Sequence, residues 1–398
     1  MYILIGLGTF FFSTPIAAIS DVVRGITQAS SIKYNNLVYE LTEQGRSIIT
    51  LSMGEASFDI PAFSFDALSL NGQEYWYSHS RGLASLREKL SVWYQNERGI
   101  CVDPKSEIII TSGAKPAIYF SLISVLDRGD EAIIFEPSWV SYVDHIRLCH
   151  ANYKAIPCTK TVFEVAEYIS DKTKVIILNN PQNPSGKVYT RQELAFLVSL
   201  AQEKGLYILA DESYSDYVGD IPFYSILEFD PEKKHVIVCN SVSKNVGMSG
   251  FRIGYVITHA DLMEHILKLN QHILTCPSTI AQYYVEYYFE KILSIVRPQI
   301  KEIIKKREAV CRMLDQLGFE VMPGTGTFYL FVSIYPTRLS SEEFCMKLLT
   351  EKGISTTPGM SYGESCNHYI RISISTEPLE TIYSALVEIK NLIKETEI

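Results

Sequence analysis

Short apolar runs alternate with longer amphipathic stretches between residues 86 and 260, and this alternation constrains the fold more than any other feature of the chain. The apolar runs are rich in Ile and Val on successive residues, which is typical of strands buried on both faces of a sheet. The stretches between them, such as 191–204, have the length and periodicity of helices. The sequence therefore predicts an α/β fold with a mostly parallel sheet flanked by helices. The predicted strands are 107–110, 131–135, 174–178, 206–210, 235–239 and 253–257.

The pattern changes after about residue 290. Long helices of mixed charge are expected at 291–317, followed by extended segments and a last helix that opens near Pro378. We predict a large domain at 51–288 and a smaller α+β domain at 289–398, to which residues 1–50 contribute.

The first twenty residues carry no charge, and polar residues and Pro15 interrupt their apolar run. A secretory signal would begin with basic residues, and a spanning helix would be more continuously apolar. We expect an arm that packs on the body or on a partner subunit, or an extension from an upstream start codon, rather than a membrane anchor.

The composition narrows the choice of partners. The chain has 398 residues, a net charge of −9 and no long basic run, which argues against nucleic acid as a partner. Its eight cysteines form no CxxC pair, so we expect neither a metal site nor a disulfide framework. Such cysteines are typical of core thiols in a reducing compartment, so a cytoplasmic location is expected.

Polar or aromatic residues follow five of the predicted strands. Ligands in open α/β sheets bind outside the carboxyl ends of the strands, so these residues are expected to converge on one crevice. They begin at Ser112-Gly113-Ala114-Lys115, Trp139, Asn183, Asp211 and Ser241.

The segment after the strand at 235–239 indicates the chemistry of this crevice. It contains Ser241, Ser243, Lys244 and Arg252 among several glycines. A lysine amine can condense with an aldehyde, and hydroxyls with an arginine can hold a phosphate. Pyridoxal 5'-phosphate carries both groups on one pyridine ring. The ring also needs an acid to keep its nitrogen protonated, and Asp211 at the end of a buried strand is the candidate, although alone it could be a helix cap.

Other candidates have roles of their own. Gly113 and Ala114 open a helix whose N-terminus would bind an anion, with Ser112 as the expected N-cap residue. Trp139 could stack on a planar ring, and Asn183 could donate to a ring oxygen, as could Tyr214. Lys115 could serve an anion or extend into solvent.

Arg371 alternates with two isoleucines on a predicted strand, so its side chain faces away from them. A guanidinium there is suited to gripping a carboxylate through two parallel hydrogen bonds.

With these motifs together, residues 15–395 resemble the class I/II aminotransferases of the pyridoxal-phosphate fold type I, most closely the bacterial aspartate aminotransferase branch. The resemblance is carried by Ser-x-Ser-Lys…Gly-x-Arg-x-Gly at 241–254, by Asn-Pro-x-Gly at 183–186 and by Asp-Glu-x-Tyr at 211–214. Ala56 and Phe251 depart from the residues usual in the family, and these departures concern the substrate rather than the cofactor.

The resemblance implies roles for individual residues. Lys244 would bind the cofactor covalently, Asp211 would pair with the ring nitrogen, and Tyr214 and Asn183 would hold the ring oxygen. Gly54 and Arg371 would grip the substrate carboxylate. The phosphate would be surrounded by Gly113, Ala114, Ser241, Ser243 and Arg252, and reached by Tyr77 from the neighbouring subunit of a homodimer. Trp139 and Lys115 match the aspartate branch, in which the lysine meets a distal carboxylate.

The expected activity is therefore transfer of an amino group from an aspartate-like amino acid to a 2-oxo acid such as 2-oxoglutarate. Lys244, Asp211 and Tyr214 would be the catalytic residues. A lyase, cyclase or synthase acting on an amino acid on the same scaffold stays open as an alternative.

Overall fold

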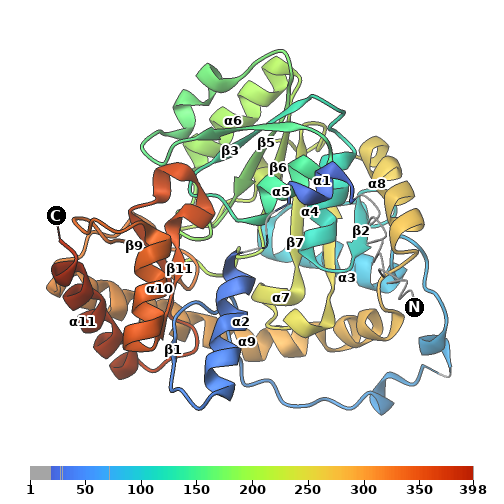
Figure 1. Ribbon diagram of the computed structural model, residues 1–398. Coiled ribbons are helices and arrows are strands. Elements are labelled where there is room, and N and C mark those ends of the chain that lie inside the picture. The colour runs from blue at the N-terminus through green and yellow to red at the C-terminus, as the bar shows by residue number, and fades with distance from the viewer. Residues whose placement is uncertain (1–18, 27, 29, 71, 398) are drawn as a thin grey trace, which may run out of the picture.

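The computed structural model describes residues 19–26, 28, 30–70 and 72–397. At its centre lies a seven-stranded sheet of order β2-β8-β7-β6-β5-β3-β4 (Figure 1). Only β8 runs antiparallel to its neighbours, so the predicted mostly parallel sheet is confirmed. The strands are β2 (Ile108–Thr111), β3 (Glu131–Phe135), β4 (Asn152–Ile156), β5 (Thr173–Asn179), β6 (Tyr207–Asp211), β7 (Val236–Ser241) and β8 (Gly254–Ile257).

Helices cover both faces of this sheet, which explains why its inner strands are apolar on successive residues. Ile108 and Ile110 pack on one face, whereas Ile109 between them packs on the other. The first face is covered by α3 (Ala84–Arg98), α6 (Arg191–Lys204) and α9 (Thr279–Gln316), and the second by α4 (Ala114–Ile123), α5 (Ser141–Leu148) and α8 (Ala260–Ile273).

The C-terminal region forms a separate sheet to one side of the first (Figure 1). It contains β11 (Thr357–Pro358), β12 (Tyr369–Ser373) and β9 (Tyr329–Ser333) in antiparallel order, with α10 (Ser341–Lys352) and α11 (Leu379–Glu395) beside them. A short parallel pair joins β1 (Ile49–Thr50) to β10 (Ile354–Ser355), so the chain near residue 50 also reaches this region. The two-domain division stays a prediction, and its boundary at 288 lies inside α9.

Two helices show why their limits can be read from the sequence. Thr190 and Glu193 form a capping box at the start of α6, and Ser340 and Glu343 form another at the start of α10. Each helix ends at a glycine in the left-handed backbone conformation, which ends the helix without steric cost because glycine has no Cβ.

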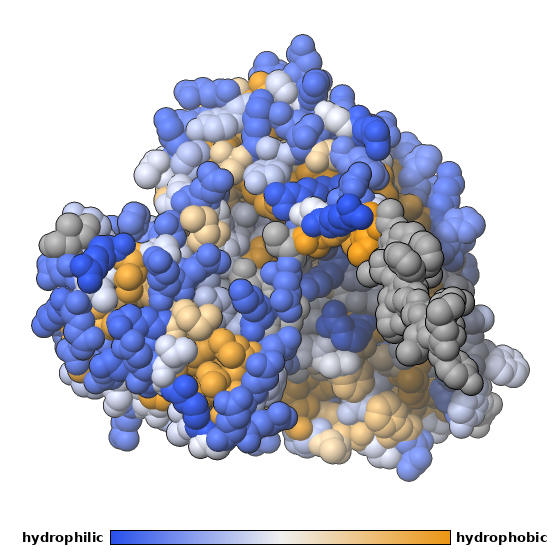
Figure 2. Space-filling model, viewed as in Figure 1, coloured by the Kyte–Doolittle hydropathy of each residue, from blue (hydrophilic) through white to orange (hydrophobic). Residues whose placement is uncertain are grey.

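Within the described residues, no helix is long and apolar enough to cross a membrane, and no cluster of acidic, histidine or cysteine side chains could hold a metal ion. The face shown in Figure 2 is largely hydrophilic. The predicted N-terminal arm lies almost wholly outside the described residues.

Candidate active site

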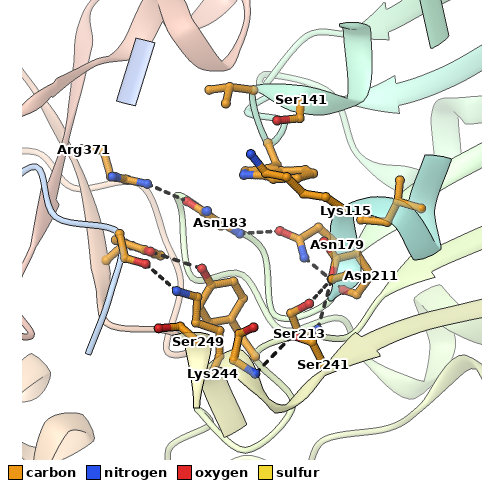
Figure 3. Close-up of a pocket in the computed structure, with 18 of the residues that line it drawn as sticks. Lys115, Ser141, Asn179, Asn183, Asp211, Ser213, Ser241, Lys244, Ser249 and Arg371 are labelled. Atoms are coloured by element: carbon orange, nitrogen blue, oxygen red, sulfur yellow. Dashed lines mark hydrogen bonds between the residues drawn. The ribbon is translucent and has the colours of Figure 1, made fainter. Parts of the chain in front are cut away.

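A pocket lies at the carboxyl ends of β5, β6 and β7, and the C-terminal sheet closes its opposite side (Figure 3). It brings together most of the residues predicted from strand ends and motifs. Its lining comprises Gly54, Ala114, Lys115, Ile118, Trp139, Val140, Ser141, Asn179, Asn183, Asp211, Ser213, Tyr214, Ser241, Ser243, Lys244, Ser249, Arg252, Tyr329 and Arg371.

Lys244 lies in the single-turn helix α7 (Val242–Asn245), directly after β7. The Ser241 side chain caps this turn by accepting a bond from the Ser243 amide, and Tyr217 donates to the Lys244 carbonyl at 3.2 Å. The Lys244 ammonium donates to the Gly54 carbonyl. Burial lowers the pKa of Lys244 to about 8, because the charged form is poorly solvated. The amine is therefore much closer to its nucleophilic form than an exposed lysine.

Asp211 ends β6 and presents its carboxylate to the same pocket. Burial raises the pKa of Asp211, and hydrogen bonds from neighbours oppose this rise. Tyr142 donates to one carboxylate oxygen at 2.9 Å, and Ser213 donates to the other through its hydroxyl at 2.6 Å. These bonds hold the carboxylate in one orientation.

At the start of α4 the backbone at Gly113 lies close to the backbone at Gly254. Gly113 is the N-cap residue, with φ of 89°, so the expected N-cap at Ser112 is wrong by one residue. A Cβ on Gly113 would collide with the Arg252 guanidinium, and a Cβ on Gly254 would collide with the Gly113 backbone. Arg252 itself adopts a left-handed conformation, which is uncommon outside glycine. The free amides of α4 and a guanidinium thus meet, as an anion site requires.

Arg371 extends from β12 into the pocket and is 3% exposed. It donates to the Ser52 carbonyl at 2.8 Å and to Asn183 Oδ1 at 3.4 Å, whereas its Nε has no partner within the part of the chain that the structure describes. The Asn183 backbone N–H donates to Asn179 Oδ1, and the Asn179 side-chain amide donates to the Asp211 backbone carbonyl. Hydrogen bonds therefore link Arg371 to Asp211 across the pocket (Figure 3).

The Lys115 ammonium lies 5.5 Å from the centre of the Trp139 ring. Burial lowers the pKa of Lys115, and the positive charge of Arg252 lowers it further. Lys115, Arg252 and Arg371 take part in no ion pair among the described residues. The pocket is therefore rich in unpaired positive charge and suits a ligand with several anionic groups.

The sequence pattern of the family Aminotransferase class I and II matches residues 46–389. This chain is a class I and II aminotransferase.

Known relatives of this aminotransferase agree over nearly the whole chain. It is 36% identical to the (5-formylfuran-3-yl)methyl phosphate transaminase of Methanocaldococcus jannaschii, over 90% of this chain and 95% of the relative. It is 31% identical to an aspartate aminotransferase of Bacillus sp. strain YM-2, over 94% and 99% of the two chains. The aspartate aminotransferase of Thermus thermophilus with maleate superposes with a TM-score of 0.87 at 26% identity, covering 95% of this chain and 100% of that one.

The aminotransferase uses pyridoxal 5'-phosphate, the cofactor of its family, and the pocket fits this molecule. The half-buried amine of Lys244 suits the aldehyde, the Arg252 guanidinium against Gly113 suits the phosphate, and Asp211 suits the ring nitrogen. The fit rests on the close approach at the start of α4, where the absence of Cβ atoms lets the Arg252 guanidinium and the Gly254 backbone lie against Gly113.

The predicted residues fall into three groups. Nearly all line the pocket, and Gly113 lies immediately beside it as the N-cap of α4. Tyr77 does not line this pocket and is 84% exposed.

Sequence reasoning missed Asn179, Ser213, Tyr142 and Tyr329. Asn179 is the last residue of β5, so the strand-end argument could have found it. Tyr142 lies three residues after Trp139, just inside α5, and this nearness to a candidate residue was its only signal. Nothing distinguishes Tyr329 from the other tyrosines in the sequence.

Proposed function

We propose that this aminotransferase transfers the amino group of an aspartate-like L-amino acid to a 2-oxo acid such as 2-oxoglutarate. One observation carries the proposal: a half-buried lysine and a buried aspartate face a pocket whose opposite wall holds an arginine, and the Nε of this arginine has no partner among the described residues. An amino acid whose carboxylate binds this arginine would present its Cα to the lysine amine.

The residues around the pocket would hold the cofactor in one orientation. Lys244 would bind its aldehyde, and Asp211 would keep its ring nitrogen protonated. Tyr214 and Asn183 would hold the ring oxygen, and Trp139 would stack on the ring. The phosphate would be bound by Gly113, Ala114, Ser241, Ser243 and Arg252. When bound, the protonated ring withdraws electrons from the substrate Cα.

Lys244 would also move the proton. Its amine takes the proton from the substrate Cα, and a pKa of about 8 keeps the amine basic without leaving it permanently charged. Arg371 would bind the α-carboxylate through two parallel hydrogen bonds, with the Gly54 backbone beside it. Both groups would fix the Cα near the amine.

Lys115 supports an acidic substrate. Its ammonium lies beside Trp139 without a carboxylate partner among the described residues. A distal carboxylate would supply that partner, and the Thermus thermophilus relative was solved with maleate, a dicarboxylate.

A second candidate acceptor is a phosphorylated aldehyde. The Methanocaldococcus jannaschii relative is named for such a substrate, and an ammonium at Lys115 can pair with phosphate as well as with carboxylate. Offering a phosphorylated aromatic aldehyde beside its dephosphorylated form separates the candidates. A strong preference for the phosphorylated form would favour the second acceptor over 2-oxoglutarate.

Replacing Lys115 with alanine tests the acidic substrate. Loss of a charge-assisted hydrogen bond should lower kcat/KM for aspartate by about 10- to 100-fold. Alanine as donor serves as the internal control and should change little. Equal losses with both donors would contradict a distal-carboxylate role.

The activity itself is tested with Lys244→Ala. The variant should lose turnover and the visible absorbance of the bound cofactor, because the amine that would bind the cofactor aldehyde is removed. Retained activity would refute the assignment. Product analysis of the wild type should give a 2-oxo acid without ammonia, whereas ammonia would indicate a lyase.

A homodimer is part of the proposal. Tyr77 belongs to a run of exposed aromatic residues, Tyr75, Trp76 and Tyr77, which are 83%, 75% and 84% exposed. Such a surface favours burial against another protein. In a homodimer Tyr77 would reach the partner's phosphate site. Light scattering of the purified protein tests this, and the cytoplasmic location also stays a prediction.

A further inference from the structure

Tyr329 contacts two residues of the pocket lining at once, although it belongs to the C-terminal sheet. Its hydroxyl lies 3.1 Å from the Tyr214 hydroxyl, and its ring lies under the Arg371 guanidinium at 4.3 Å. The side chain is 1% exposed, so these contacts are shielded from water.

The sheet register explains why one ring can reach both groups. Tyr329 pairs directly with Ser373 on β12, and Arg371 lies two residues away on the same strand. Diagonal neighbours in an antiparallel pair share a face and remain within reach of an aromatic side chain. Tyr329 therefore lies between the arginine of one sheet and the tyrosine of the other.

The backbone before Tyr329 is held in an uncommon conformation. Thr327 has φ of 62°, which is a genuine outlier for a β-branched residue. Its amide donates to the Tyr217 carbonyl at 2.9 Å, and its hydroxyl accepts from the Tyr329 amide at 3.2 Å. At Gly326 a Cβ would lie 2.8 Å from Pro181 Cβ. Strain of this kind persists only where the surroundings fix it, and it clusters at functional sites.

We propose that Tyr329 is a positioning residue that couples the substrate-carboxylate clamp to the tyrosine at the cofactor oxygen. The inference rests on the proposed roles of Arg371 and Tyr214. The Tyr329 ring fixes the guanidinium by a cation–π contact, and its hydroxyl donates to the Tyr214 oxygen when Tyr214 donates to the cofactor. Donation to Tyr214 strengthens Tyr214 as a donor, because consecutive hydrogen bonds polarise one another.

Two substitutions separate the ring from the hydroxyl. In the holoenzyme, Tyr329→Phe should raise the pH midpoint of the cofactor absorbance by roughly 0.1–0.4 pH unit, because the cofactor oxygen loses part of its stabilisation. The affinity for maleate should stay within about twofold, because the ring is kept. Tyr329→Leu should also raise the maleate Kd by about 3- to 30-fold.

The chain offers a matched control. Tyr94 and Tyr255 form another buried pair of tyrosine hydroxyls at 3.2 Å, outside the pocket lining. Tyr94→Phe should change neither the midpoint nor the maleate Kd. An unchanged midpoint in Tyr329→Phe, or an equal shift in Tyr94→Phe, would overturn the proposal.

Failure of the proposed function would look different. If Arg371→Leu leaves the maleate Kd unchanged, the carboxylate clamp itself is wrong. If Arg371→Leu weakens maleate binding and a folded Tyr329→Leu does not, only the coupling is wrong. Circular dichroism establishes folding, and should Tyr329→Leu not fold, the midpoint of Tyr329→Phe alone decides.

Discussion

The two walls of the pocket differ in how the sequence encodes them. On the wall formed by the seven-stranded sheet, Asp211 ends β6 and Lys244 follows β7 within one helical turn. On the wall beside the C-terminal sheet, Arg371 reaches the Ser52 carbonyl, which is 319 residues away in the chain. The first wall is made of local motifs, and the second is assembled by packing between distant segments.

This difference shows which part of the fold positions each group of pocket residues. Strand ends place the proposed cofactor residues directly, because parallel strands present their carboxyl ends at one edge. The proposed substrate clamp depends instead on how the two sheets pack, because its arginine reaches groups that are distant in the chain. The hydrogen bonds from Arg371 through Asn183 and Asn179 to Asp211 connect the two walls.

The largest expected effect concerns the sheet wall. Asp211→Asn should lower kcat by about 10²–10³-fold with saturating cofactor, because a neutral amide no longer stabilises a charged ring nitrogen. Glu212→Gln is the matched control, since Glu212 is the adjacent buried carboxyl and bonds to Ser225 and the Ile226 amide instead. Steady-state kinetics of both variants should differ strongly. Similar losses would show that burial of charge, rather than position in the pocket, matters.

The next effect concerns the opposite wall. Arg371→Lys should raise KM for the amino donor by about 10- to 100-fold, because an ammonium cannot form two parallel bonds to a carboxylate. The cofactor absorbance should be retained, since the sheet wall is intact. A loss of cofactor binding with unchanged KM would contradict the assignment of Arg371 to substrate binding rather than to cofactor binding.

A third substitution probes the anion site on the sheet wall. Gly113→Ala would place a Cβ against Arg252, so the cofactor Kd should rise by about tenfold or more, measured by titrating the cofactor-free protein. Gly129→Ala is the control, because Gly129 has a similar φ of 88° and nothing within 4 Å of the added atom. The control should lose stability by about 1 kcal/mol without losing cofactor affinity. Equal losses of cofactor affinity would assign the effect to backbone strain.

The smallest expected effect is on the pH dependence of the free energy of unfolding, and it concerns Glu212 on the sheet wall. Burial raises the pKa of Glu212 from 4.5 to about 7. Between these values the folded protein keeps a proton that the unfolded chain releases, so the free energy of unfolding decreases as the pH rises. Glu212→Gln should remove a slope of at most about 1.4 kcal/mol per pH unit in this window. Urea denaturation at pH 5, 6 and 7 measures it, and an unchanged slope would contradict the burial argument.

The sequence predicted much of the sheet and the sheet wall, because both depend on local pattern. Apolar runs gave six of the strands closely, but β4 was missed. Asn152 and Tyr153 in β4 are exposed at the edge, so no apolar run marks it, and β3 is the only strand that pairs with it among the described residues. The start of α9 was also missed, because its first turns are rich in aromatic and β-branched residues, which are weak helix formers.

By itself, the sequence determined the α/β fold, the family and the residues that follow the strands, because strand ends and helix caps act over a few residues. Only the tertiary structure decided which distant side chains meet. Tyr142 reaches Asp211 across 69 residues and Tyr329 reaches Tyr214 across 115, and such contacts depend on sheet register and helix packing. The residues next to a tyrosine in the sequence do not show which distant residue it will contact in the folded protein.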